Sequence, residues 1–251
     1  MPLLADLIDL PSQPLISMVG AGGKTTTMYT LARELAWQGK RVITTTTTQI
    51  FTPGADETEM LIVEAETSRL LDRVMAAWQP YQRITVASSV NERGKLFGIQ
   101  PDIPSLLFAQ GGADAVIIEA DGARHRMIKA PADYEPVVPS ATNVALLLMS
   151  AEAINQPLSE AIAHRPERIA AVSGITMGEM LTPDVVARLM TSEQGALKGI
   201  PENAKAYVLV THTTDKKVDS IRELARLVMD SPRIMGTRCS ERAGEWFIPL
   251  R

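Results

Sequence analysis

The sequence predicts an α/β fold in which helices cover both faces of a mainly parallel sheet. Short, continuous apolar runs alternate along the chain with segments of helical periodicity. The first run, residues 15–19, leads into a glycine-rich turn and then into an amphipathic segment, and a second run follows at residues 41–46. Strand, helix and strand in this order form a βαβ unit, which requires a parallel pair with a right-handed crossover.

The first predicted helix follows the glycine-rich turn. Met28, Leu31 and Leu35 recur at helical spacing, and Gly39 supplies the left-handed residue that commonly ends a helix. A second amphipathic helix is predicted around Leu71 and Trp78 because apolar residues recur there with the same period.

Further apolar runs predict the remaining strands. Residues 115–118 and 144–149 are uninterrupted runs, typical of strands covered on both faces, so we expect them at the centre of the sheet. Residues 83–87 and 207–210 predict two more strands, and residues 246–250 an edge strand. Residues 91–98 indicate a turn or hairpin.

The chain divides by these signals into three parts. Residues 1–149 form the predicted P-loop nucleotide-binding core, residues 150–205 a mainly helical insertion, and residues 206–251 a strand, helix and strand that complete the core. Within the insertion, Thr182 and Pro183 have the residue types of an N-cap and a first-turn proline.

The composition restricts the classes of partner. The chain of 251 residues is 45% hydrophobic and 22% charged, with a net charge of −4, so we expect a folded protein that binds neither nucleic acid nor an anionic membrane. Cys239 is its single cysteine, which suits a reducing compartment. Because no long apolar run is found, we expect a cytoplasmic protein.

The strongest functional signal is a phosphate-binding loop between the first strand and the first helix. The loop comprises Gly20, Ala21, Gly22, Gly23, Lys24, Thr25 and Thr26. Glycines allow backbone N–H groups to face phosphates, Lys24 can reach the terminal phosphates, and Thr25 can bind Mg²⁺. The usual longer pattern would place a glycine at Met18, so this is the shorter Gly-x-x-Gly-Lys-Thr form. The loop predicts a P-loop NTPase-like fold that binds ATP or GTP with Mg²⁺.

Two carboxylates follow the apolar strand near residue 118. Residues two apart on a strand share a face, so Glu119 and Asp121 can serve one site, as catalytic groups or Mg²⁺ ligands, if the strand persists. The alternative is a strand followed by an ordinary Asp-Gly turn. The phosphate loop favours the functional interpretation.

Polar residues after other strands extend the predicted site. Thr45 and Thr46 end the second strand, where they can face the triphosphate, although threonine is also a good strand former. A basic stretch comes after the acidic pair, and a second basic motif lies further along. As substrate-binding candidates for an anionic second substrate, we name Arg124, Arg126, Lys129, His164 and Arg165. A solvated basic loop is the alternative for the first three of these residues.

These motifs together resemble the YqeC family, accessory proteins of selenium-dependent molybdenum hydroxylases. The likeness also covers Gly94-Lys95-Leu96, Lys129-Ala130-Pro131, and Glu135-Pro136-Val137. It implies a nucleotide-dependent step in maturing a client hydroxylase, with a molybdenum-cofactor or selenium intermediate as second partner. Related sequences often have an Asn-Lys-x-Asp-like element where this chain has residues 210–215, so guanine selection by that element is not predicted.

Two functions fit these observations. The first is an NTPase, or a phosphoryl-transfer or ligase-type enzyme, since the short loop also resembles that of Mur-type ligases. The second is a nucleotide-switched carrier or assembly chaperone without small-molecule chemistry of its own. A loop used only as a scaffold would bind no nucleotide.

Overall fold

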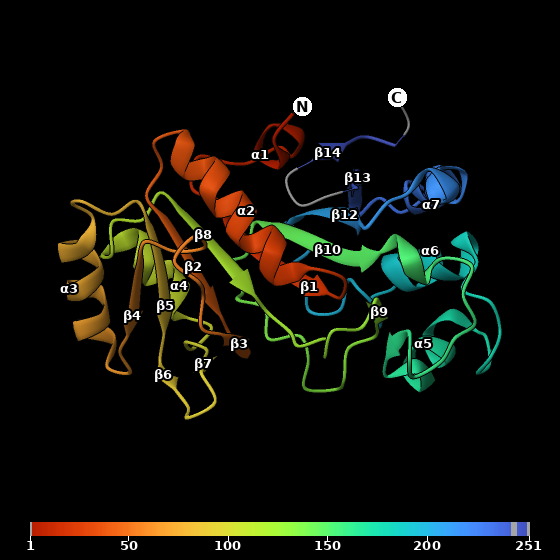
Figure 1. Cartoon of the computed structure of the whole chain (residues 1–251), viewed down its shortest axis with the longest axis horizontal. Helices are drawn as coiled ribbons and strands as arrows, with labels where there is room; N and C mark the ends of the chain where they lie inside the picture. The colour runs from red at the N-terminus through yellow and green to blue at the C-terminus, as the bar shows by residue number, and fades with distance from the viewer. Residues whose placement is uncertain (1, 242–244, 250–251) are drawn as a thin grey trace.

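A nine-stranded sheet forms the centre of the protein, which we describe from a computed structural model over residues 2–241 and 245–249 (Figure 1). The strand order is β14-β13-β12-β10-β1-β8-β2-β5-β4. Every neighbouring pair is parallel except β13 and β14. The predicted mainly parallel α/β class is therefore confirmed.

The central sheet and two smaller sheets account for the strands. The central strands are β1 (Leu15–Gly20), β2 (Val42–Thr46), β4 (Met60–Val63), β5 (Arg83–Ala87), β8 (Ala115–Glu119), β10 (Val144–Ser150), β12 (Lys205–Thr211), β13 (Ile234–Ser240) and β14 (Trp246–Phe247). The smaller sheets contain β3 (Gln49–Phe51), β6 (Ser89–Val90) and β7 (Lys95–Phe97), and β9 (Ile128–Lys129) and β11 (Ala163–His164).

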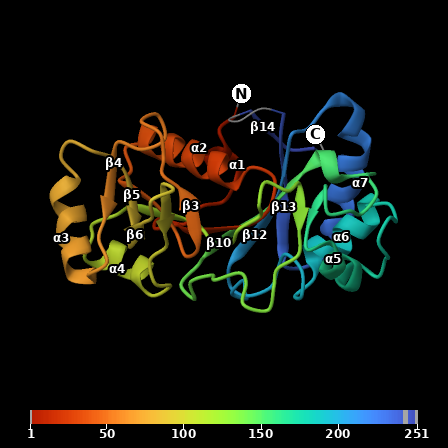
Figure 2. The ribbon, with the colours of Figure 1, turned by 60° about the horizontal axis from the view of Figure 1, so that its bottom comes forward.

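Helices cover both faces of the sheet (Figure 2). They are α1 (Leu4–Leu7), α2 (Lys24–Trp37), α3 (Thr67–Ala77), α4 (Ile103–Ala109), α5 (Pro166–Ser173), α6 (Pro183–Thr191) and α7 (Val218–Val228), with short 3₁₀ turns η1 (Ala151–Ala153) and η2 (Asp215–Lys217). α1 and α2 pack on one face, and α3 to α7 contribute to the core on the other.

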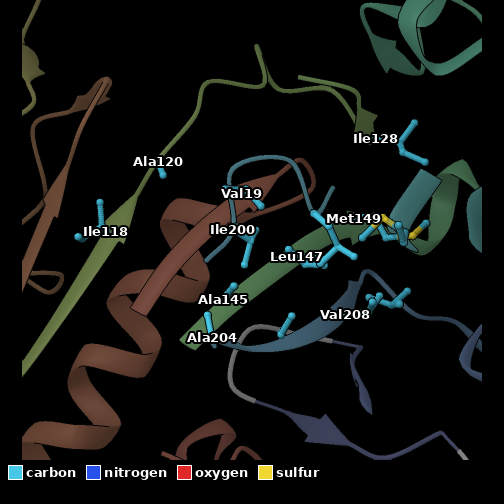
Figure 3. Packing of buried hydrophobic residues seen from close by; sticks show 14 of the residues in the cluster. Val19, Ile118, Ala120, Ile128, Ala145, Leu147, Met149, Ile200, Ala204 and Val208 are labelled. Carbon is cyan, nitrogen blue, oxygen red and sulfur yellow. The ribbon is translucent and has the colours of Figure 1, made fainter. Parts of the chain in front are cut away.

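The alternating side chains of the buried strands supply both cores. On β1, Ile16 and Met18 face the core that contains α2, whereas Val19 faces the opposite core. Figure 3 shows Val19 near Leu147 of β10, with Ile200 from the chain before β12 beside them. Fully buried apolar side chains on both faces explain why these strands are continuous apolar runs.

The segment between β10 and β12 contains the helices α5 and α6 and the 3₁₀ turn η1, with turns and irregular chain between them. The Thr182 hydroxyl accepts a hydrogen bond from the Val185 N–H at 3.4 Å, and Pro183 occupies the first turn of α6. The helices α5, α6 and α7 share one hydrophobic core with the sheet. The division of the chain into three parts at residues 149 and 205 stays a prediction.

The predicted C-terminal edge strand is present over its first two residues. β14 pairs antiparallel with β13 at residues 246–247. Residue 250, the end of the predicted strand, lies outside the described residues. No helix in residues 2–241 and 245–249 is both long enough and apolar enough to cross a membrane.

Candidate functional site

The glycine-rich loop lies between β1 and α2, at the carboxyl edge of the parallel strands. Gly20, Gly22 and Gly23 have φ angles of 99°, 78° and 102°, a region that side chains with a Cβ rarely adopt. A Cβ on Gly20 would also lie 2.2 Å from the backbone oxygen of Leu148 on the neighbouring β10. The loop therefore requires glycine both for its backbone angles and for its closeness to β10.

The backbone N–H groups of this loop are of two kinds. Those of Gly20, Ala21 and Gly22 each donate to an oxygen of the protein, at 2.9 to 3.2 Å. Those of residues 23–26 open α2 and meet no acceptor in the part of the chain that the structure describes. Unpaired donors at a helix N-terminus, together with the helix dipole, form an anion-binding site. The sequence-predicted phosphate loop thus has donors available for an anion.

Lys24 folds back over its own loop. Its side chain is only 3% exposed, and Nζ donates to the Gly20 carbonyl at 2.6 Å. Nζ lies 3.2 Å from Asp121 Oδ1 and 3.7 Å from Glu119 Oε1. Both predicted carboxylates therefore converge on the loop lysine.

Glu119 is the last residue of β8, the strand beside β1. Its Oε2 accepts a hydrogen bond of 2.7 Å from the Thr25 hydroxyl. Burial raises the pKa of the Glu119 carboxyl, and the nearby Lys24 charge and the Thr25 hydrogen bond partly offset this effect. A hydroxyl and a carboxylate in contact are hard oxygen ligands of the kind that Mg²⁺ prefers.

The donor set also indicates how Mg²⁺ would be held. Within the described residues no group of three or more His, Cys, Asp or Glu side chains could hold a metal ion. In nucleotide sites Mg²⁺ usually keeps water and phosphate oxygens as ligands besides one or two protein groups, which Thr25 and Glu119 could supply. Asp121, the other predicted ligand, is paired with Lys24 and Lys129, and its role as a Mg²⁺ ligand stays a prediction. The residues present fit Mg²⁺ delivered with a nucleotide.

Asp121 lies two residues beyond the end of β8 and is 2% exposed. Its Oδ2 accepts the Gly20 N–H at 3.1 Å and pairs with Lys129 Nζ at 2.9 Å. This carboxylate thus connects the phosphate loop to β9. It supports the loop and Lys24 from behind, while Glu119 reaches the Thr25 hydroxyl.

A buried network of ion pairs continues from Asp121. Lys129 pairs with Glu135 at 2.7 Å, and Glu135 pairs with Arg165 at 2.7 Å. Burial would raise the pKa of Glu135, but the hydrogen bonds from Arg165 and Lys129 prevail and lower it to about 2. Burial and the Arg165 and Lys129 charges lower the pKa of His164 to about 4. Lys129, His164 and Arg165 are thus brought together, but as parts of a paired network.

A cleft of about 820 Å³ opens in front of the phosphate loop. Its walls come from the loop, the antiparallel strand pair β3–β7, the chain after β8 and the ends of β10 and β12. The lining residues are Gly22, Gly23, Lys24, Thr25, Thr26, Thr48, Gln49, Ile50, Phe51, Lys95, Glu119, Gly122, Ala123, Arg124, His125, Arg126, Met127, Tyr134, Glu135, Val137, Ser150, Glu152 and His212. The predicted loop and the basic stretch after β8 therefore meet in one cleft.

The basic stretch lies across the mouth of the phosphate loop. Arg124 and Arg126 are exposed and line the cleft. The backbone oxygen of Arg126 accepts the Gly22 N–H at 3.2 Å, and the Ser150 N–H donates to the Met127 oxygen at 2.8 Å. This segment thus bridges from β8 to β10 and contacts the loop directly.

Comparison with known proteins identifies the family of this chain. A sequence model described as YqeC protein matches residues 16–167. The chain belongs to the YqeC family. The match includes the phosphate loop, both carboxylates and His164 and Arg165, and it ends before β12.

The comparisons also match this YqeC-family chain to a curated protein and, weakly, to solved structures. An uncharacterized protein YqeC from Escherichia coli (strain K12) is 29% identical over 208 residues, which cover 79% of this chain and 77% of that protein. FtsY from Mycoplasma mycoides is 13% identical, with a TM-score of 0.40, over 96% of this chain and 66% of its own. A signal recognition particle 54 kDa protein from Aeropyrum pernix K1, in complex with GDP, is 16% identical with a TM-score of 0.42, over 95% of this chain and 45% of its own.

The threonines at the end of β2 support the candidate site from within the fold. Thr45 is fully buried and its hydroxyl donates to the Val86 oxygen at 2.8 Å. The Thr46 hydroxyl donates to the Glu119 backbone oxygen at 2.7 Å, so it fixes the end of β8. Neither residue lines the cleft, whereas Thr48 does. The predicted nucleotide contact of Thr45 and Thr46 stays a prediction, and their observed role is structural.

Two residues where β12 ends, of which His212 lines the cleft, were not predicted as site residues. The Thr211 hydroxyl donates to the Gly22 oxygen at 2.5 Å, and His212 follows with its Nδ1 3.0 Å from the same hydroxyl. A signal for them was present, because β12 is a parallel strand and its polar carboxyl end must reach the same edge as the phosphate loop. Glu135 was named only within a motif of the family resemblance, because it lies in the loop after β9, where no strand end indicates its position.

Proposed function

We propose that this YqeC-family protein binds ATP or GTP with Mg²⁺ at residues 20–26 and hydrolyses the nucleotide or transfers its terminal phosphoryl group. The observation that carries this proposal is the set of N–H groups at residues 23–26, which meet no protein acceptor in the described part of the chain and open into the cleft. Lys24 and the Thr25–Glu119 pair lie beside them.

Each side chain has a role in this proposal. Thr25 and Glu119 would hold Mg²⁺, which neutralises phosphate charge and stabilises the charge that develops during phosphoryl transfer. Lys24 would leave the Gly20 oxygen and Asp121 to contact the terminal phosphates. Asp121 would remain neutralised, because Lys129 pairs with its other oxygen at 2.9 Å.

We place this activity in the cytoplasm, in the maturation of a selenium-dependent molybdenum hydroxylase. The motifs that the chain has in common with the YqeC family support this role in hydroxylase maturation. The second partner would then be a molybdenum-cofactor or selenium intermediate, or the hydroxylase itself.

A second candidate function, a nucleotide-switched carrier, is favoured by one contact. The Gly22 N–H donates to the Arg126 oxygen, so a phosphate that draws on this N–H competes directly with the basic segment. Such competition would couple nucleotide binding to the position of residues 122–127. Hydrolysis stimulated by a small molecule would favour the enzyme, and stimulation by a hydroxylase client would favour the carrier.

Calorimetry with ATP, GTP and their non-hydrolysable analogues, with and without Mg²⁺, tests the proposal. We expect Lys24→Ala to weaken triphosphate binding at least tenfold, about 1.4 kcal/mol. Lys40→Ala is the matched control, since Lys40 follows the other end of α2. Thermal unfolding of each variant verifies that it folds. Unchanged affinity in a folded Lys24→Ala variant, or no binding by the native chain, would contradict the proposal.

A further inference from the structure

We propose that the side of the cleft formed by the antiparallel strand pair β3–β7 is a separate subsite for an anion carried on a planar or aromatic group. This inference rests on the proposed function, because it assigns the second substrate of the same cleft. The subsite is bounded by Phe51 of β3 and Lys95 of β7, by Arg124 and Arg126, and by Tyr134.

The first argument is the local charge. Lys95, Arg124 and Arg126 line the cleft, and no carboxylate in the described part of the chain lies within ion-pair distance of any of them. The other lysine of the cleft, Lys24, is paired. Since the whole chain has a net charge of −4, this unpaired positive charge is a local feature and not a general one. Clustered guanidinium groups suit a phosphate or carboxylate, which they can bind through paired donors.

The second argument is the exposure of two aromatic rings in the same place. Phe51 is 53% exposed and Tyr134 is 75% exposed, although both line the cleft. Lys95 Nζ lies 5.1 Å from the centre of the Phe51 ring, so one wall presents a cation and an apolar face together. Exposed rings beside cations offer stacking and apolar contact to a flat ligand.

The two walls of the subsite are fixed relative to each other. The Thr47 hydroxyl, just before β3, donates to the Val137 oxygen at 2.6 Å, close along the chain to Tyr134. The Val137 N–H in turn donates to the Ala120 oxygen at 3.1 Å, directly after β8. The wall formed by β3 and β7 and the wall that contains Tyr134 are therefore both connected to the end of β8, the strand that carries Glu119.

The sheet order places one wall of this subsite on one side of the phosphate loop. β10 and β12, with Thr211 and His212, lie on one side of β1, whereas β8 and β2 lie on the other. β3 follows β2 in the chain and pairs with β7, so the residues of this strand pair are on the Glu119 side of the loop. A nucleotide held at residues 23–26 would leave the β3–β7 side of the cleft for a second ligand.

Phenyl phosphate is a suitable probe because it joins a dianion to a ring. We would titrate it, by calorimetry or ligand-observed NMR, into the full chain both alone and saturated with Mg²⁺ and a non-hydrolysable triphosphate analogue. Inorganic phosphate and phenol are the controls that each lack one half of the probe. We expect phenyl phosphate to bind the saturated protein at least fivefold more tightly than either control.

Substitutions locate the binding. Arg124→Gln with Arg126→Gln should weaken phenyl phosphate binding at least tenfold and lower phenyl phosphate affinity at least fivefold more than nucleotide affinity. Phe51→Ala should weaken the probe at least threefold without changing the affinity for inorganic phosphate. Arg93→Gln, in the exposed turn between β6 and β7, is the matched control and should have no effect.

The outcomes distinguish this inference from the proposed function. Displacement of the probe by the triphosphate, or equal losses for probe and nucleotide in the double variant, would assign these arginines to the nucleotide and overturn the inference. Binding of the probe that is insensitive to all three substitutions would also overturn it. If no nucleotide binds but the probe binds the free chain with the expected pattern, the subsite is supported and the proposed function fails.

Discussion

The cleft and the network behind it place neighbouring cations in opposite surroundings. Arg124 and Arg126 are exposed in the cleft, with no carboxylate partner in the described part of the chain. Lys129, three residues further along, is buried between Asp121 and Glu135. One short segment therefore contains both exposed cations of the cleft and a buried, paired cation, and residue type alone does not distinguish the two.

Glu119 and Asp121 also differ in their surroundings, since only Glu119 lines the cleft. Glu119 ends β8, lines the cleft and accepts the Thr25 hydroxyl. Asp121 is buried behind the loop, where it accepts the Gly20 N–H and pairs with Lys129. We therefore expect substitutions at Glu119 to change ligand binding and substitutions behind the loop to change stability first.

The largest expected effect separates the two regions by stability. Lys129→Met removes the buried cation between the buried Asp121 and the half-buried Glu135 and should lower the free energy of unfolding by about 3 kcal/mol, as breaking a buried ion pair does. Arg126→Met, on the exposed side, should change it by less than about 0.5 kcal/mol. Urea unfolding followed by circular dichroism measures both. Equal losses in the two variants would remove the distinction between cleft and network.

A second, smaller effect concerns the pH dependence of the network. The pKa of Glu135 is lowered from its ordinary 4.5 to about 2, so its stabilising contribution is present above about 4.5 and is lost as the pH falls toward 2. Glu135→Gln should cost about 2 kcal/mol of unfolding free energy at pH 7. The difference between native chain and variant should shrink between pH 4.5 and 2 in urea unfolding curves. A difference independent of pH would contradict the role of the charged carboxylate.

Much of the fold was predictable because its signals are local. The runs at residues 15–19, 83–87, 115–118 and 144–149 are strands, because a strand buried on both faces needs uninterrupted apolar residues. β13 gave no such signal, since Gly236 and Arg238 interrupt its apolar pattern. The phosphate loop was predictable because its glycines are required by backbone geometry.

The arrangement around the loop was less predictable. The expectation that Glu119 and Asp121 share a strand face depended on a strand that continues past residue 119, but β8 ends there. The burial of Lys129 depends on Glu135 and Arg165, which the chain brings together from a loop and from the start of α5. Partners of this kind follow from tertiary contacts, which spacing along the sequence does not contain.

The distinct roles of the two carboxylates give the most direct test of the account. Nucleotide affinity would be measured by calorimetry with and without Mg²⁺ for Glu119→Gln and Asp121→Asn, each with its melting temperature. We expect Glu119→Gln to reduce the gain in affinity that Mg²⁺ provides at least tenfold, about 1.4 kcal/mol, because it removes a charged oxygen ligand. Asp121→Asn should weaken binding to a similar extent with and without Mg²⁺, because it acts through Lys24 and the loop. A loss specific to Mg²⁺ in Asp121→Asn, with none in Glu119→Gln, would contradict the account.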